Sequence, residues 1–103
     1  MESLVESFEE GRYRYRQIER HGMLAIFEQQ HKDNPRVVRY EVVRIRIQRA
    51  HTWPDGTVTP EKEAYPPSSA WGTSGWTFYT LDAARAHLQT LLQRATVIAE
   101  VSE

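Results

Sequence analysis

Tyrosine and arginine alternate near the start of the chain. Tyr13 and Tyr15 fall between three arginines, a period of two that predicts a half-buried strand with tyrosines on one face and arginines on the other. The three arginines are Arg12, Arg14 and Arg16. A turn at His21-Gly22 is followed by an apolar run over residues 23–27. Together these stretches predict an antiparallel β-hairpin.

A longer strand is predicted over residues 37–49, after a turn at residues 33–35. Its β-branched content is high, but the alternation changes phase at the adjacent pair Val42 and Val43. Two interpretations stay open. A β-bulge at this pair would bend the strand and turn both apolar sets toward one core, whereas a long strand could instead cross between two packing surfaces.

Glycine and proline are concentrated over residues 50–75, which predicts an unusually long connection. Within it, Trp53 to Thr57 has the composition of a hairpin turn, so residues 51–53 and Val58 are expected to extend the sheet. After the connection, residues 76–79 predict a short strand.

A C-terminal helix is predicted over residues 81–95. The hydroxyl of Thr80 can accept from the first-turn amides, and Asp82 suits the positive end of the helix dipole. Whether residues 96–101 continue the helix or form an edge strand stays open. The apolar positions with helical spacing are Leu81, Ala84, Leu88, Leu91, Ala95 and Ile98.

Strands first and a helix last are typical of the α+β class. We therefore expect a single α+β domain over residues 1–103: a bent antiparallel sheet of three to five strands, with one C-terminal helix packed on one face. An acidic N-terminal segment covers residues 1–10. The longest apolar run has five residues, far short of the roughly 20 that span a bilayer, and the acidic opening does not resemble a signal peptide. We expect a cytoplasmic protein without a membrane partner.

The net charge of −1 conceals a polarised chain. Residues 12–49 carry nine Arg and one Lys against four acidic residues, a net charge of +6, and the rest of the chain carries −7. Such a distribution indicates either an anion-binding face or an acidic part folded back over a basic part.

The arginines are the first candidate binding surface. Arg12, Arg14 and Arg16 on one strand, with Arg44 and Arg46 on another, could form a solvent face that grips phosphates or carboxylates. Nucleic acid is one possible ligand, although a pI near 6.4 is low for a nucleic-acid-binding domain. Contact with a protein partner or with a second copy of the chain is the other, because arginine and tyrosine are enriched at interfaces.

Trp71 is the second candidate. With Trp76 it brackets Gly72 and Gly75, and it could anchor a partner. The alternative is structural: Trp76 enters the core on the last strand, and Trp71 covers a part of the sheet that a single helix cannot reach.

No catalytic, metal or cofactor site is predicted, and we do not expect an enzyme. The chain has no cysteine, and its four histidines are scattered without the i, i+4 spacing of a zinc protease motif. Its serines lie in no glycine-flanked nucleophile elbow. The junction before the helix, at residues 79–81, has no glycine that could cradle a phosphate.

Several short motifs carry a resemblance that covers roughly residues 13–91. They are Tyr40-Glu41-Val42, Tyr65-Pro66 with Ser68, Trp71-Gly72, Trp76-Thr77 and Ala83-Ala84. In this order they resemble a group of small uncharacterised phage and prophage proteins, from which the chain departs by having Pro67 before Ser68. The resemblance implies a small α+β protein that binds a host or phage component, and it brings no enzymatic activity. We expect a non-catalytic binding protein that acts through a protein partner or as a homodimer; the alternative is a nucleic-acid-binding module that uses the arginine face.

Overall fold

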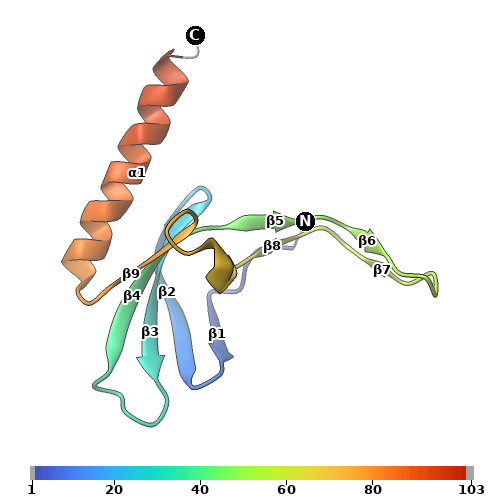
Figure 1. The fold of residues 1–103 in the computed structure, drawn as a ribbon, viewed down its shortest axis with the longest axis horizontal. Helices are drawn as coiled ribbons and strands as arrows, with labels where there is room; N and C mark the ends of the chain where they lie inside the picture. The colour runs from blue at the N-terminus through green and yellow to red at the C-terminus, as the bar shows by residue number, and fades with distance from the viewer. Residues whose placement is uncertain (1, 102–103) are drawn as a thin grey trace.

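The computed structural model describes the backbone of residues 2–101 and the side chains of residues 2–94. Its main element is a five-stranded antiparallel sheet with the strand order β1-β2-β3-β4-β9 (Figure 1). The strands are β1 (Ser7–Glu10), β2 (Tyr13–His21), β3 (Leu24–His31), β4 (Val38–Arg44) and β9 (Gly75–Phe78).

A single helix, α1 (Leu81–Val101), packs on one face of this sheet, against β3, β4 and β9. The predicted α+β class and architecture are therefore confirmed. The buried side chains between helix and sheet are Leu24, Ile26, Val42, Ala84, Leu88 and Leu91, with Trp76 and Phe78 packed beside them. We call this side the helix-covered face.

The helix begins as the sequence predicts and runs further than predicted. The backbone amide of Ala83 donates to the Thr80 hydroxyl over 3.2 Å, which caps the first turn. The helix continues through residues 96–101, so the edge-strand alternative is wrong. The predicted apolar positions Ala95 and Ile98 lie outside the residues whose side chains are described.

The opposite side of the sheet, which we call the aromatic face, has a second core. The return segment of residues 65–74, which includes the short 3₁₀ helix η1 (Ser68–Ala70), covers it in place of a helix. Its buried residues are Ala25, Phe27, Val43 and Ile45, and Leu4, Phe8, Tyr15, Tyr65 and Trp71 pack against them.

The phase change in the long strand is explained by these two cores. β4 pairs with β3 residue for residue from Val38 to Arg44, so the predicted bulge at Val42 and Val43 is wrong. Val42 packs on the helix-covered face and Val43 on the aromatic face, which is the alternative of a strand that serves two surfaces. The register shift occurs instead in β2, between Gln17 and Glu19.

Beyond β4 the chain leaves the sheet as a hairpin, residues 46–64, which we call the arm. In it β5 (Arg46–Gln48) pairs with β8 (Lys62–Ala64), and β6 (His51–Thr52) pairs with β7 (Val58–Thr59). The predicted hairpin turn at residues 53–57 is confirmed by two backbone hydrogen bonds between Trp53, Gly56 and Thr57. The predicted extension of the main sheet is wrong, because the arm strands form two separate two-stranded sheets.

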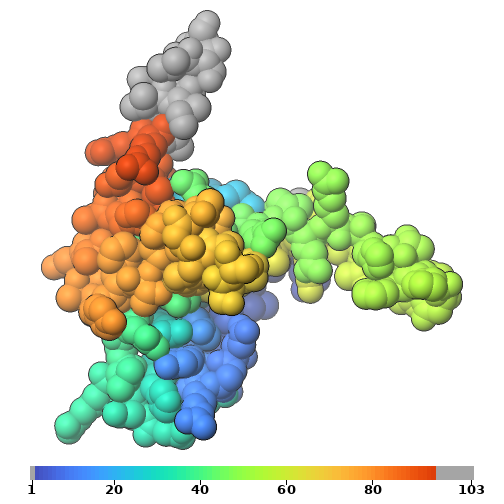
Figure 2. Space-filling view, in the orientation of Figure 1, coloured from blue at the N-terminus to red at the C-terminus, as the bar shows by residue number. Residues whose placement is uncertain are grey.

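The arm stands clear of the sheet and the helix (Figures 1 and 2). A compact chain of about 100 residues has a radius of gyration of about 13 Å, whereas this chain has 15.7 Å. Arg20 holds the base of the arm through two hydrogen bonds to Glu63, of 2.7 and 2.9 Å. The backbone of Glu2 also bonds to Glu61 and Glu63, so the N-terminal segment lies along the arm's base.

Candidate functional site

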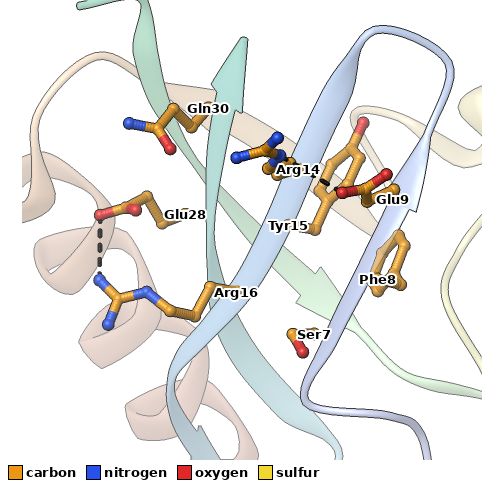
Figure 3. A pocket seen from close by; sticks show the side chains of 8 residues that line it. All are labelled: Ser7, Phe8, Glu9, Arg14, Tyr15, Arg16, Glu28 and Gln30. Atoms are coloured by element: carbon orange, nitrogen blue, oxygen red, sulfur yellow. Dashed lines mark hydrogen bonds and ion pairs between the residues drawn. The ribbon is translucent and has the colours of Figure 1, made fainter. Parts of the chain in front are cut away.

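Arg14 and Arg16 line one depression of about 450 Å³ on the helix-covered face (Figure 3). The Arg14 Nε atom lies 3.3 Å from a carboxylate oxygen of Glu9, and the Arg16 Nη2 atom lies 3.4 Å from one of Glu28. Exposed ion pairs of this kind are weak, so an incoming anion could compete for either guanidinium. Each arginine in this depression is nevertheless balanced by a carboxylate.

The other predicted arginines do not join this depression. Arg12 lies in the turn before β2 and is not part of the lining. Arg44 pairs with Leu24, four residues along β3 from Glu28, the partner of Arg16. The two arginines are therefore offset by about 13 Å along the strand direction, and they also lie on opposite sides of β3. The guanidinium of Arg44 lies over the Trp76 ring, 5.8 Å from the centroid. Arg46 is on β5 of the arm. Of the five predicted arginines, the structure therefore brings two together in one depression and places the other three elsewhere.

Acidic and basic segments of the chain form ion pairs with each other. A carboxylate oxygen of Glu9, in the acidic N-terminal segment, also lies 3.0 Å from the Nζ atom of Lys32. Glu63 of the arm forms an ion pair with Arg20. Among the described side chains, three ion pairs thus join acids outside residues 12–49 to bases inside that range. These contacts fit one of the two alternatives left open by the charge distribution, acidic segments folded back over basic ones.

Trp71 lies on the aromatic face, away from the arginine depression. Its indole N–H donates to the Thr77 hydroxyl over 2.9 Å, and its ring packs against the second core. A Cβ at Gly75 would come within 2.6 Å of the ring, so the glycine allows the ring to lie against β9. Trp71 therefore covers the face opposite the helix, and it also borders a pocket.

This second pocket, of about 420 Å³, opens between the return segment and the sheet, and we call it the Glu41 pocket. Rings of Tyr15, Tyr65 and Trp71 stand around it, and two prolines add apolar surface. Its lining residues are Glu10, Gly11, Tyr15, Glu41, Tyr65, Pro66, Pro67, Ser68 and Trp71.

Glu41 is the unusual member, because it is a carboxyl group on a central strand with only 7% of its surface exposed. The Tyr65 hydroxyl donates to it over 2.6 Å, and Thr77, which accepts from Trp71, also bonds to it. Burial raises the pKa of Glu41, and this outweighs the lowering by Tyr65, by the charge of Arg39 and by Thr77. Burial also raises the pKa of Tyr65, with the charge of Glu41 adding to it.

Further polar groups lie on the same face. Gln29 is 7% exposed and donates to the Tyr15 hydroxyl over 2.9 Å, while its Oε1 accepts no hydrogen bond from the described residues. Arg39 donates to the Tyr13 hydroxyl over 2.9 Å. The aromatic face therefore buries several polar groups that simple packing does not require.

Of the residues lining this pocket, only Trp71 is predicted from the sequence as a site residue. The available signal was Glu41, a charged residue between apolar neighbours in a strand buried on both faces. The motifs quoted for the resemblance also supply Tyr65, Pro66 and Ser68, which fall far from Glu41 in the sequence but line this pocket with it and Trp71.

No family model, curated protein or solved structure matches this chain. The resemblance to phage and prophage proteins therefore stays a prediction, and the function is inferred from the geometry. Within the described residues, no group of three or more histidine, aspartate or glutamate side chains is arranged to hold a metal ion. Among the same residues, no helix has both the length and the apolar character of a membrane span.

The arm is the third surface of interest. Trp53 is 51% exposed, Val58 59% and Ile47 43%, although all three are large apolar side chains. Trp53 is held in place within the arm by two contacts. Its indole N–H donates to the Thr59 hydroxyl over 2.9 Å, and its ring centroid lies 4.4 Å from that of His51.

Proposed function

We propose that this chain is a non-catalytic binding protein that engages a protein partner through the arm. The observation that carries the proposal is the exposure of Trp53 and Val58, which lie at the turn of the arm. The arm itself stands clear of the rest of the molecule (Figure 2). Exposed large apolar side chains on a projecting element are typical of interaction sites, and tryptophan is among the residues that contribute most at interfaces.

The build of the arm supports this use. A two-stranded hairpin is marginally stable by itself in water, yet this one is held at its base by the contact of Arg20 with Glu63. Near the tip, Thr59 and His51 fix the Trp53 ring before any partner arrives. A side chain that is already ordered loses less entropy on binding.

The charge of the arm favours a protein over nucleic acid. Arg46, Arg49 and Lys62 are matched in number by Asp55, Glu61 and Glu63. Attraction to phosphates supplies most of the affinity in non-specific nucleic-acid binding, and an arm without excess positive charge offers little of it.

The test is a comparison of the wild type with a Trp53→Ser, Val58→Ser double variant. Both are used as bait in lysate of the native host, with and without nuclease, beside a matched surface variant of the helix, Gln89→Ser. A captured protein is then purified and its affinity for each bait measured directly. Sedimentation of all three proteins reports self-association.

We expect a partner that binds the wild type and the helix variant alike and binds the arm variant at least tenfold more weakly. If the wild type sediments as a dimer and the arm variant as a monomer, the partner is a second copy of the chain. Equal affinity of the arm variant for every captured protein, with unchanged sedimentation, would overturn the proposal.

A further inference from the structure

We infer that the Glu41 pocket binds an organic cation: an ammonium or guanidinium head, carried by a small amine or by a basic side chain, with an aliphatic stem that lies against the aromatic and proline walls. The inference concerns the aromatic face and does not depend on the arm.

The walls of the pocket suit a cation with an apolar stem. The Tyr65 ring lies 5.8 Å from that of Tyr15 and 6.4 Å from that of Trp71, centroid to centroid, so three electron-rich rings gather at one site. A cation within about 6 Å of such a ring is attracted to its face, more strongly where water is excluded. Pro66 and Pro67 add rigid apolar surface for the stem.

The charges select a cation over a neutral or anionic ligand. Within the described part of the chain, the charged residues that line the pocket are Glu10 and Glu41, both acidic. A buried carboxylate is costly unless a positive charge accompanies it. Arg39, on the same strand, acts on Glu41 through its charge, but its guanidinium donates to Tyr13 and is not part of the lining.

The dimensions and donors favour an organic ligand over a metal ion. A volume of about 420 Å³ lies within the range of roughly 300 to 1,000 Å³ typical of small-ligand sites. The two carboxylates fall short of the six or more oxygen ligands that a calcium ion prefers, and the described residues have no metal-binding cluster.

The experiment is an NMR titration of the full chain that follows the indole N–H signal of Trp71. The probes are Nα-acetyl-lysine methylamide, Nα-acetyl-arginine methylamide, free n-butylammonium, and Nα-acetyl-norleucine methylamide as the uncharged analogue. The proteins are the wild type, Glu41→Gln, which keeps the side-chain shape, and Glu28→Gln, which removes the same charge in the arginine depression.

We expect the lysine or arginine probe to bind the wild type about tenfold or more tightly than the norleucine probe. Glu41→Gln should lose this preference while its melting temperature stays equal or rises, and Glu28→Gln should keep it. A tighter fit for butylammonium than for the capped amino acids identifies a free amine as the ligand, and the reverse identifies a side chain of a protein. Equal binding of charged and uncharged probes, absence of binding, or equal weakening by both glutamate variants would overturn the inference.

Discussion

The two faces of the same sheet differ in what they bury and in what covers them. On the helix-covered face, Leu24, Ile26 and Val42 meet Leu88 and Leu91 in an aliphatic core. The aromatic face has more rings packed against its core, carries a buried carboxyl group and a buried amide group, and is covered by a loop segment.

This difference bears on how much each face stabilises the fold. Aliphatic packing against a helix removes apolar surface from water, so it contributes most to the free energy of folding. On this face the described side chains leave one buried polar atom without a hydrogen-bond partner, His87 Nε2 beside Trp76. A buried carboxylate has the opposite effect from aliphatic packing, because it must be desolvated, and sites that keep such groups are commonly binding or catalytic. The contrast predicts how substitutions on each face should behave.

The largest effect is expected for Leu88→Ala on the helix-covered face. Leu88 is fully buried, so its truncation should lower the free energy of unfolding by about 2 to 5 kcal/mol, a large share of the roughly 5 to 15 typical of a small domain. Thermal or urea unfolding measures it, with Gln89→Ala on the exposed side of the same helix as the control. Equal losses for the two variants would contradict the packing of α1.

On the aromatic face, Trp71→Ala should have a smaller effect. Trp71 is half-buried, and its truncation removes both its packing and its hydrogen bond to Thr77. The free energy of unfolding should therefore fall by about 1 to 3 kcal/mol. Gly75→Ala should displace the same ring, because the added Cβ would clash with it. An unchanged melting temperature for Trp71→Ala, with strong iodide quenching in a Trp53→Phe, Trp76→Phe background, would mean that Trp71 is a free anchor.

The helix-covered face was largely predictable from the sequence. Period-two alternation in β2 and β4 and the helical spacing from Leu81 to Leu91 are local signals, and each places apolar side chains on one side of its element. Thr80 marked the start of the helix for the same reason, since a capping hydroxyl acts within one turn.

The aromatic face and the course of the arm were not predictable in this way, although the turn at the tip of the arm was. The Glu41 pocket joins β1, β2, β4 and the return segment, and contacts between residues so far apart leave no periodicity in the sequence. Pairing of the arm strands with each other, instead of with the main sheet, depends on where the chain turns away at Ile45. Of the two interpretations of Val42 and Val43, the bulge is wrong because it required both apolar sets to face one core, whereas the fold has two.

Acid titration should distinguish Glu41 from Glu63, another acid that bonds to a neighbouring segment. Because the pKa of Glu41 is raised above 4.5, the folded state keeps its proton after the unfolded state has released it, and stability falls as the pH rises through that range. The melting temperature of Glu41→Gln should therefore rise relative to that of the wild type as the pH increases from 4 to about 7.

Glu63→Gln should show the opposite trend. Hydrogen bonds from Arg20 and from the Leu4 amide lower the pKa of Glu63 to about 2, so its contribution is present above pH 4.5 and is lost as the pH falls toward 2. The variant should be less stable than the wild type near neutral pH, and the two should converge in acid. Parallel pH profiles for the two glutamine variants would show that the carboxyl groups do not differ in this way.

The smallest effect is expected for the substitution of arginines, measured as a change in affinity for DNA or RNA. Arg14 and Arg16 are each balanced by a glutamate, and Arg46 lies apart on the arm, so the arginines do not form one positive surface. We expect the wild type to bind DNA or RNA no more tightly than about 10 μM near physiological salt, the level of non-specific phosphate attraction. An Arg14→Glu, Arg46→Glu variant should then differ little from it in a mobility-shift titration. Submicromolar binding by the wild type that falls steeply between about 50 and 200 mM salt, and is absent in the variant, would instead make the arginine face the functional one.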